Sequence, residues 1–153
     1  MATAQEFYDK FRATEAGKDA PDTVLEECIY AFGTGEMADR LSELVCAGIK
    51  RATTDVEDLI EFYEERKPAV GDYNIVLNAA GEPVAITKVT RVEVTPFDEI
   101  TDEYAFIEGE GDKSLAYWKN GHEKFFAPFY EEAGIPWTGK NLMYCIYFEL
   151  VYK

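Results

Sequence analysis

Apolar positions recur at helical spacing through the first third of the chain. Residues 4–15 carry apolar side chains on one face, and the same spacing returns over 21–32 and 36–47. Pro21 favours the start of the second segment, and Gly48 favours a stop after the third. The pattern therefore predicts three amphipathic helices.

The next segment changes character around a short polar run. Residues 49–53 are predicted to be extended. Thr54 and Glu57 then stand three apart before an apolar stretch, which is the form of a capping box. A helix is predicted from there to about Arg66.

Strand patterns dominate the middle and the end of the chain. Residues 73–78 and 83–94 are rich in β-branched side chains and flank a turn, so they are predicted to pair as a hairpin. Residues 142–152 form a nearly continuous apolar run, which is typical of a central strand.

Between these strands the chain becomes acidic and then helical again. Residues 98–112 hold seven acids and no base, and they are predicted to form a loop with a short helix. A helix is predicted over 113–132, kinked at Pro128, with Trp118 and His122 on its apolar face. The order of elements predicts an α+β fold with a small mixed sheet or open barrel.

Composition bounds the class of protein. The 153 residues suit one domain, 1–153, and 47% of them are apolar, enough for a core without metals or disulfides. The cysteines Cys28, Cys46 and Cys145 are odd in number and form no CxxC pair, so free thiols are expected. Neither an apolar run of membrane-spanning length nor a signal peptide is present, so a cytoplasmic location without a membrane partner is expected.

Net charge restricts the partners. The formal charge of −15 opposes binding to long nucleic acid, which depends on contacts from Lys and Arg to phosphates. No binding to DNA is expected. A nucleotide or RNA ligand would have to meet a small local pocket.

Lys50 and Thr53 are the residue pair that most clearly indicates a chemical function in this chain. They stand three apart, beside Arg51, and lead into the predicted helix N-terminus, whose free N–H groups favour anions and carbonyl oxygens. The alternative is a Thr54 cap, an ordinary strand residue at Thr53 and solvated cations. Spacing alone leaves both interpretations open.

The run Ala47-Gly48-Ile49-Lys50-Arg51-Ala52-Thr53 resembles the G-x-K-x-x-T signature of the ASCH domain (activating-signal-cointegrator homology). The resemblance covers roughly residues 30–152 and leaves 1–30 as an N-terminal helical extension. Further matching segments follow in order: 70–77, 81–83, 92–100, 108–118 and the closing aromatic strand.

This resemblance implies a PUA-like β-barrel with helices at its edge and an association with RNA binding. In the branch of the family that deacetylates acetylated cytidine, a lysine activates a threonine and a glutamate handles protons. Those catalytic roles would fall to Lys50, Thr53 and Glu108, with Glu110 as the second choice of glutamate. Lysine serves as a base only if burial or a nearby cation, here Arg51, lowers its pKa.

Ligand-binding roles are predicted for a further set: Arg51, Arg91, Glu110, Asp112, Ser114 and Trp118. The competing interpretations are a solvated loop for the acidic residues and a core position for Trp118.

Three functions stay open. The first is an amidohydrolase acting on an acylated base such as N4-acetylcytidine, without metal or cofactor. The second is a ribonuclease using Mg²⁺ or Mn²⁺ at an acidic cluster, Glu108, Glu110 and Asp112. The third is a non-catalytic module that binds RNA, a nucleotide or a modified base.

Overall fold

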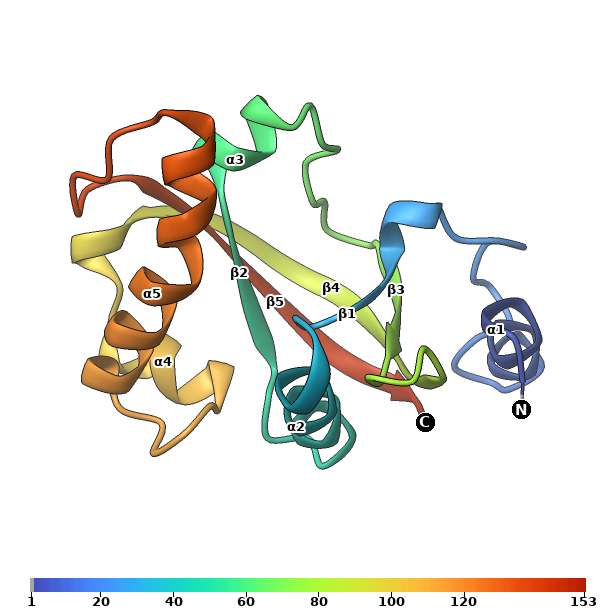
Figure 1. The fold of residues 1–153 in the computed structure, drawn as a ribbon. Helices are drawn as coiled ribbons and strands as arrows, with labels where there is room; N and C mark the ends of the chain where they lie inside the picture. Colours follow the sequence, from blue (N-terminus) through green and yellow to red (C-terminus); the bar gives the residue numbers. More distant parts are fainter. Residues whose placement is uncertain (1) are drawn as a thin grey trace.

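Five strands form one strongly curled sheet, an open half-barrel, in a computed structural model that describes residues 2–153 (Figure 1). The order across the sheet is β1-β3-β4-β5-β2. β1 pairs with β3 in parallel, and the other neighbours are antiparallel. The strands are β1 (Ile29–Ala31), β2 (Ala52–Val56), β3 (Tyr73–Leu77), β4 (Pro83–Pro96) and β5 (Leu142–Tyr152).

Within the described residues, five α-helices lie around this sheet. In Figure 1, α1 lies near β3 at one end, α4 and α5 lie at the other end, and β2 runs between α2 and α5. Their bounds are α1 (Ala4–Arg12), α2 (Gly35–Cys46), α3 (Glu57–Phe62), α4 (Asp102–Glu108) and α5 (Leu115–Ala133). Short 3₁₀ turns cover Glu26–Cys28 and Phe97–Glu99. The predicted α+β class is confirmed, and most predicted elements match within a few residues.

The helix predicted over 21–32 is wrong. This segment forms a 3₁₀ turn and then β1, in which Ile29 lies opposite Ile75 of β3. Phe32, just after β1, is buried in a cluster with residues of α2. Pairing with a buried strand therefore overrides the helical spacing of the apolar residues.

The capping box predicted at Thr54 is also wrong. β2 continues through Val56, with Thr54 opposite Cys145 of β5, and α3 begins only at Glu57. Val56 occupies the N-cap and no side chain caps the helix. The predicted helix N-terminus beside Lys50 is therefore absent, and strand residues take its place.

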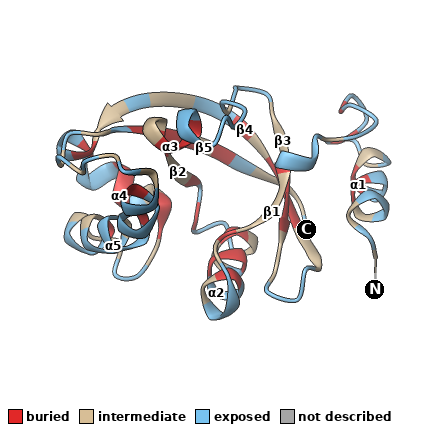
Figure 2. Ribbon diagram, turned by 45° about the horizontal axis from the view of Figure 1, so that its top comes forward, coloured by how far each residue is buried: buried red, intermediate tan, exposed pale blue. Residues whose placement is uncertain are grey.

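Buried side chains form separate clusters on the two faces of the sheet. Figure 2 marks the buried stretches along the strands and helices. Met143 and Cys145 of β5 pack with α4 and α5, whereas Phe148 packs with α2. Alternate residues of a strand point to opposite faces, so β5 divides the two clusters. α1 closes the far end, where Tyr8 and Phe11 are fully buried.

The structure bears on the expectations about free thiols and about membrane-spanning segments. Cys28 and Cys145 are buried, Cys46 is half-buried, and all three thiols are free. Within residues 2–153, the helices are too short or too polar to cross a bilayer.

Candidate functional site

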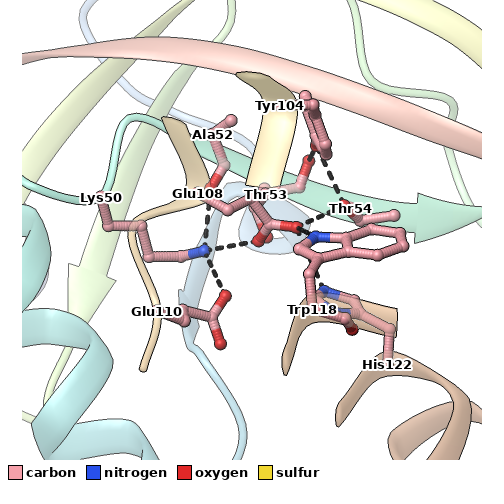
Figure 3. A network of polar contacts seen from close by, with 9 residues as sticks. All are labelled: Lys50, Ala52, Thr53, Thr54, Tyr104, Glu108, Glu110, Trp118 and His122. Carbon is pink, nitrogen blue, oxygen red and sulfur yellow. Dashed lines mark hydrogen bonds and ion pairs between the residues drawn. The ribbon is translucent and has the colours of Figure 1, made fainter. Parts of the chain in front are cut away.

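A cavity of about 810 Å³ opens between α2 and α5, on the face of the sheet that carries Thr53 and Ile146. Aromatic side chains from β1, the loop after it and α5 form much of its wall: Tyr30, Phe32, Tyr117, Trp118 and Phe125. Charged and polar side chains from β2, α4, α5 and the loops beside them line another part: Lys50, Thr53, Glu108, Glu110 and His122. Figure 3 shows how these polar residues converge.

Lys50 is the buried cation at the centre of this polar region, with 1% of its side chain exposed. The chain leaves α2 through a left-handed residue, Gly48, and the N–H groups of Ile49 and Lys50 both bond to the carbonyl of Leu44. This turn aims Lys50 inward. Its Nζ donates to the Ala52 carbonyl at 2.8 Å.

Two carboxylates accept the other protons of Lys50. Nζ lies 2.8 Å from Glu108 Oε1 and 2.9 Å from Glu110 Oε2. An ammonium group has three protons to donate, so every one is used. Lys50 therefore has no free donor in this structure.

Gly109 allows both glutamates to face one lysine. It ends α4 in the left-handed conformation, with φ 74°, between the two acids. A Cβ at this position would meet the Ile49 carbonyl oxygen at 2.5 Å. Only glycine permits this close approach without a shift of backbone.

Glu108 is saturated with donors. Its Oε2 accepts from the Thr54 hydroxyl at 2.7 Å, from His122 Nε2 at 3.1 Å and from the indole N–H of Trp118. Together with Lys50, four side chains hold one carboxylate that is 1% exposed. Glu108 is thus built into the fold as an anchor.

The two carboxylates differ in their proton affinity. Burial opposes the charge of Glu108, but Lys50 and His122 outweigh it and hold its pKa well below the usual range. Burial raises the pKa of Glu110 in spite of Lys50, and the negative charge of Glu108 raises it further. Glu110 is therefore the first of the pair to take up a proton.

The expected lowering of the Lys50 pKa is wrong. Burial does favour the neutral amine, but Glu108 and Glu110 outweigh it and raise the pKa. Arg51, the cation expected to assist, is exposed and lies outside the cavity lining. The physical conditions for a lysine base are not met in this structure.

Thr53 does share the cavity with Lys50. It lies in β2 opposite Ile146, and its carbonyl accepts from the Tyr104 hydroxyl at 2.7 Å. Thr54 also lines the cavity, but its hydroxyl points toward Tyr104 and Glu108. The side chains of Thr53 and Thr54 thus point to opposite faces of β2, as the pleat of a strand requires.

Besides Arg51, three further predicted ligand-binding residues lie outside the cavity. Arg91 of β4 is paired with Glu93 and covers the ring of Tyr147, whose centroid lies 4.8 Å away. Asp112 accepts from the Ser114 N–H at 2.9 Å, and Ser114 caps α5. Neither these residues nor Arg91 line the cavity.

Trp118 is both a core residue and part of the cavity wall. It is 2% exposed and stacks on His122, with ring centroids 4.1 Å apart. His122 was expected to be buried, but its bond to Glu108 was not predicted. Its position four residues after Trp118, on the same helix face, indicates the stacking of the two rings and not the bond to Glu108. Tyr104, four residues before Glu108 in α4, is a second missed residue.

The acidic cluster expected to bind a metal is only partly assembled. Glu108, Glu110 and His122 bring their ligand atoms within 4.8 Å of one another, but Asp112 lies outside the group. The Lys50 ammonium already bonds both carboxylates and would face any added cation. These residues therefore do not fit a Mg²⁺ or Mn²⁺ site, which needs free oxygen ligands.

A family model and a solved structure identify the same family. The family model for the ASCH domain matches residues 27–152. No curated protein matches the chain. The crystal structure of an ASCH domain from Lactobacillus crispatus JV V101 is 28% identical, with a TM-score of 0.87, over 98% of this chain and 94% of that one.

Two further solved structures are similar. Protein EF3133 from Enterococcus faecalis V583, of family DUF984, is 30% identical with a TM-score of 0.81, over 95% of this chain and 86% of that one. The hypothetical protein PH0355 is 22% identical with a TM-score of 0.51, over 80% of this chain and 98% of that one. The last likeness concerns the fold alone.

Proposed function

Because this chain belongs to the ASCH domain family, whose PUA-like fold suggests binding of RNA or nucleotides, we propose that its cavity binds a single nucleoside. The composition of the cavity wall is the main observation in favour of nucleoside binding. Aromatic side chains such as Tyr117 and Trp118 line the same space as Lys50, Thr53 and Glu110. Aromatic faces stack on bases, and polar groups read their edges.

Charge favours a nucleoside over a phosphate-rich ligand. Lys50 is neutralised by Glu108 and Glu110, and Arg66 is held by Asp72. His122 also faces Glu108. The other acidic and basic residues of the lining are two cations and three acids: Arg40, Lys124, Glu27, Asp55 and Glu65. This balance, within a chain of net charge −15, gives no broad attraction for a phosphate backbone.

Calorimetric titration tests this proposal. Cytidine, N4-acetylcytidine, cytidine monophosphate and a short RNA are titrated into the protein and into Tyr117→Ala. Tyr117 is 43% exposed at the cavity, so its removal should cost stacking without unfolding the core. We expect nucleoside binding to weaken at least about fivefold.

Phe106→Ala is the matched control, since Phe106 is 53% exposed and lies outside the cavity. Equal binding by wild type and Tyr117→Ala, or no nucleoside binding at all, contradicts the proposal.

Hydrolysis of an acylated base is a second candidate, favoured by Thr53 and Glu110 lining the same cavity. The Thr53 hydroxyl would attack the acyl carbon and pass its proton to Glu110. The carbon–nitrogen bond then breaks, the amine leaves with that proton, and water hydrolyses the threonine ester to release the acid. Lys50 stays an ammonium and orients Glu110.

The test of turnover is separate from the test of binding. N4-acetylcytidine is incubated with wild type and Thr53→Val, and the release of cytidine is followed by chromatography. We expect Thr53→Val to lose at least about 100-fold in rate, since it removes the nucleophile. Thr90→Val is the control, because Thr90 is an exposed residue of β4 and lies outside the cavity. Tight binding without any cytidine release rejects hydrolysis and leaves the binding proposal standing.

A further inference from the structure

A second recess adjoins the cavity at the junction of α3 and α5. This α3–α5 recess has a volume of about 450 Å³. Hydrogen bonds from Tyr63 to Glu132 at 3.1 Å and from Tyr130 to Asp58 at 2.9 Å hold the two elements together. Its lining residues are Asp55, Leu59, Tyr63, Glu65, Phe125, Phe126 and Phe129.

Aromatic rings dominate the lining. Tyr63, Phe125 and Phe129 remain 40%, 41% and 39% exposed, on elements that face each other. The Phe125 and Phe129 centroids lie 5.8 Å apart at 49°, and Phe126 lies 5.5 Å from Phe125 at 72°. Rings at such angles present their faces in several directions around one space.

Two carboxylates complete the lining and lack a counter-charge there. Asp55 Oδ1 accepts only the Val56 N–H, at 2.8 Å. Burial raises the pKa of Asp55, and burial together with the Asp55 charge raises the pKa of Glu65. The described lining residues include no lysine, arginine or histidine. The neighbouring Arg66 donates both of its bonds to Asp72, each at 2.8 Å.

We propose that the α3–α5 recess binds an alkylammonium cation. Aromatic faces carry partial negative charge and attract cations that are weakly hydrated, and quaternary ammonium groups are the cations they bind best. Asp55 and Glu65 add full negative charge at the wall. An anion or a second acidic copy of this chain would be repelled by the same carboxylates. This inference does not depend on the proposed nucleoside function.

The cation has two possible sources with the same chemistry. It is either a free small molecule with a trimethylammonium group or the side chain of a trimethylated lysine on another protein. The recess is open to solvent through its exposed rings, so both forms have access. The experiment separates them by using choline and a short peptide that carries one trimethyllysine.

The test follows backbone amide shifts by NMR during titration. Choline and the peptide are compared with 3,3-dimethylbutan-1-ol, a neutral molecule of the same shape as choline. We expect shifts around the recess with the cations, and binding at least about tenfold weaker for the neutral molecule. Tighter binding of choline assigns a free ligand, and tighter binding of the peptide assigns a lysine side chain.

Variants locate the binding. Phe129→Leu removes one ring and should weaken cation binding by about two- to fivefold, and Asp55→Asn should weaken it as well. Phe106→Leu and Glu131→Gln are the controls, because both residues are exposed and lie outside the recess. The spectra themselves report whether each variant is folded. Equal binding of the neutral molecule, unchanged binding in both recess variants, or no shift with either cation overturns the proposal.

Discussion

Glu108 is the residue on which the polar region of the cavity depends. Lys50, Thr54, Trp118 and His122 all donate to its carboxylate, and they come from different parts of the chain. A buried charge of this kind is stable only while its partners remain. Glu110, in contrast, shares one bond with Lys50 and is 16% exposed.

Replacing the two glutamates should therefore have unequal effects. We expect Glu108→Gln to lower the free energy of unfolding by about 3–5 kcal/mol, because Lys50 and His122 both lose the buried carboxylate that they share. Glu110→Gln should cost about 1 kcal/mol, since Glu108 still neutralises Lys50. Urea denaturation at neutral pH measures both. An equal loss in the two variants would contradict the anchoring role of Glu108.

The protonation of His122 gives a second test at this scale. Burial alone would lower its pKa, but the Glu108 carboxylate outweighs burial and raises it. The imidazolium should therefore stabilise the fold fully below its unfolded pKa of about 6.5, with that contribution lost as the pH rises through the folded pKa.

His122 is the only histidine in the sequence, so its NMR titration is unambiguous. We expect the pKa of His122 in the folded protein to lie above about 6.5. In Glu108→Gln this pKa should fall, because the negative charge beside the imidazole is gone. A wild-type His122 pKa below the unfolded value would show that burial outweighs the Glu108 charge.

The sequence indicated which residues matter here better than it indicated their state. Lys50 and Thr53 were singled out by their spacing, and the family resemblance supported them and indicated the glutamates. The Lys50 pKa was predicted with the wrong sign because its two carboxylates lie 58 and 60 residues away along the chain. No local pattern reports a partner at that separation.

At the scale of elements, strand pairing decided the outcomes that local patterns missed. Thr54 and Glu57 have the spacing of a capping box, yet β2 pairs with the central strand β5 through Val56. The segment 21–32 has helical spacing, yet β1 adds to the sheet beside β3. The long strands, α2 and α5 were predicted well because their periodicity agrees with their packing.

The capping of α5 tests how this helix is held in place. The Ser114 side chain accepts from the Tyr117 N–H at 3.1 Å, whereas Thr34 at the start of α2 makes no such bond. We expect Ser114→Ala to lower the free energy of unfolding by about 1 kcal/mol, and Thr34→Ala to lower it much less. Thermal and urea denaturation provide the comparison. Similar losses in both variants would show that the Ser114 hydroxyl does not stabilise α5.

At the scale of the whole molecule, strong acidity coexists with a buried cation. The net charge of the chain is −15, while the buried Lys50 is enclosed by Glu108 and Glu110. Such a protein has little long-range attraction for polyanions. A single uncharged nucleoside carries no phosphate, so the negative charge of the protein does not repel it.

Salt dependence measures this difference. We expect the affinity for cytidine to change less than about twofold between about 50 and 200 mM salt, because no phosphate counterions are released. Titrations at the two salt concentrations provide the values. A steep loss of affinity with salt would indicate that phosphate-type contacts, and not the base, drive binding.

The most direct test of the central claim is a crystal structure of the protein soaked with cytidine. We expect the base in the 810 Å³ cavity, stacked on an aromatic side chain of its wall and within hydrogen-bond distance of Glu110 or Thr53. A cavity that stays empty at saturating cytidine, or a nucleoside bound outside it, would contradict the account.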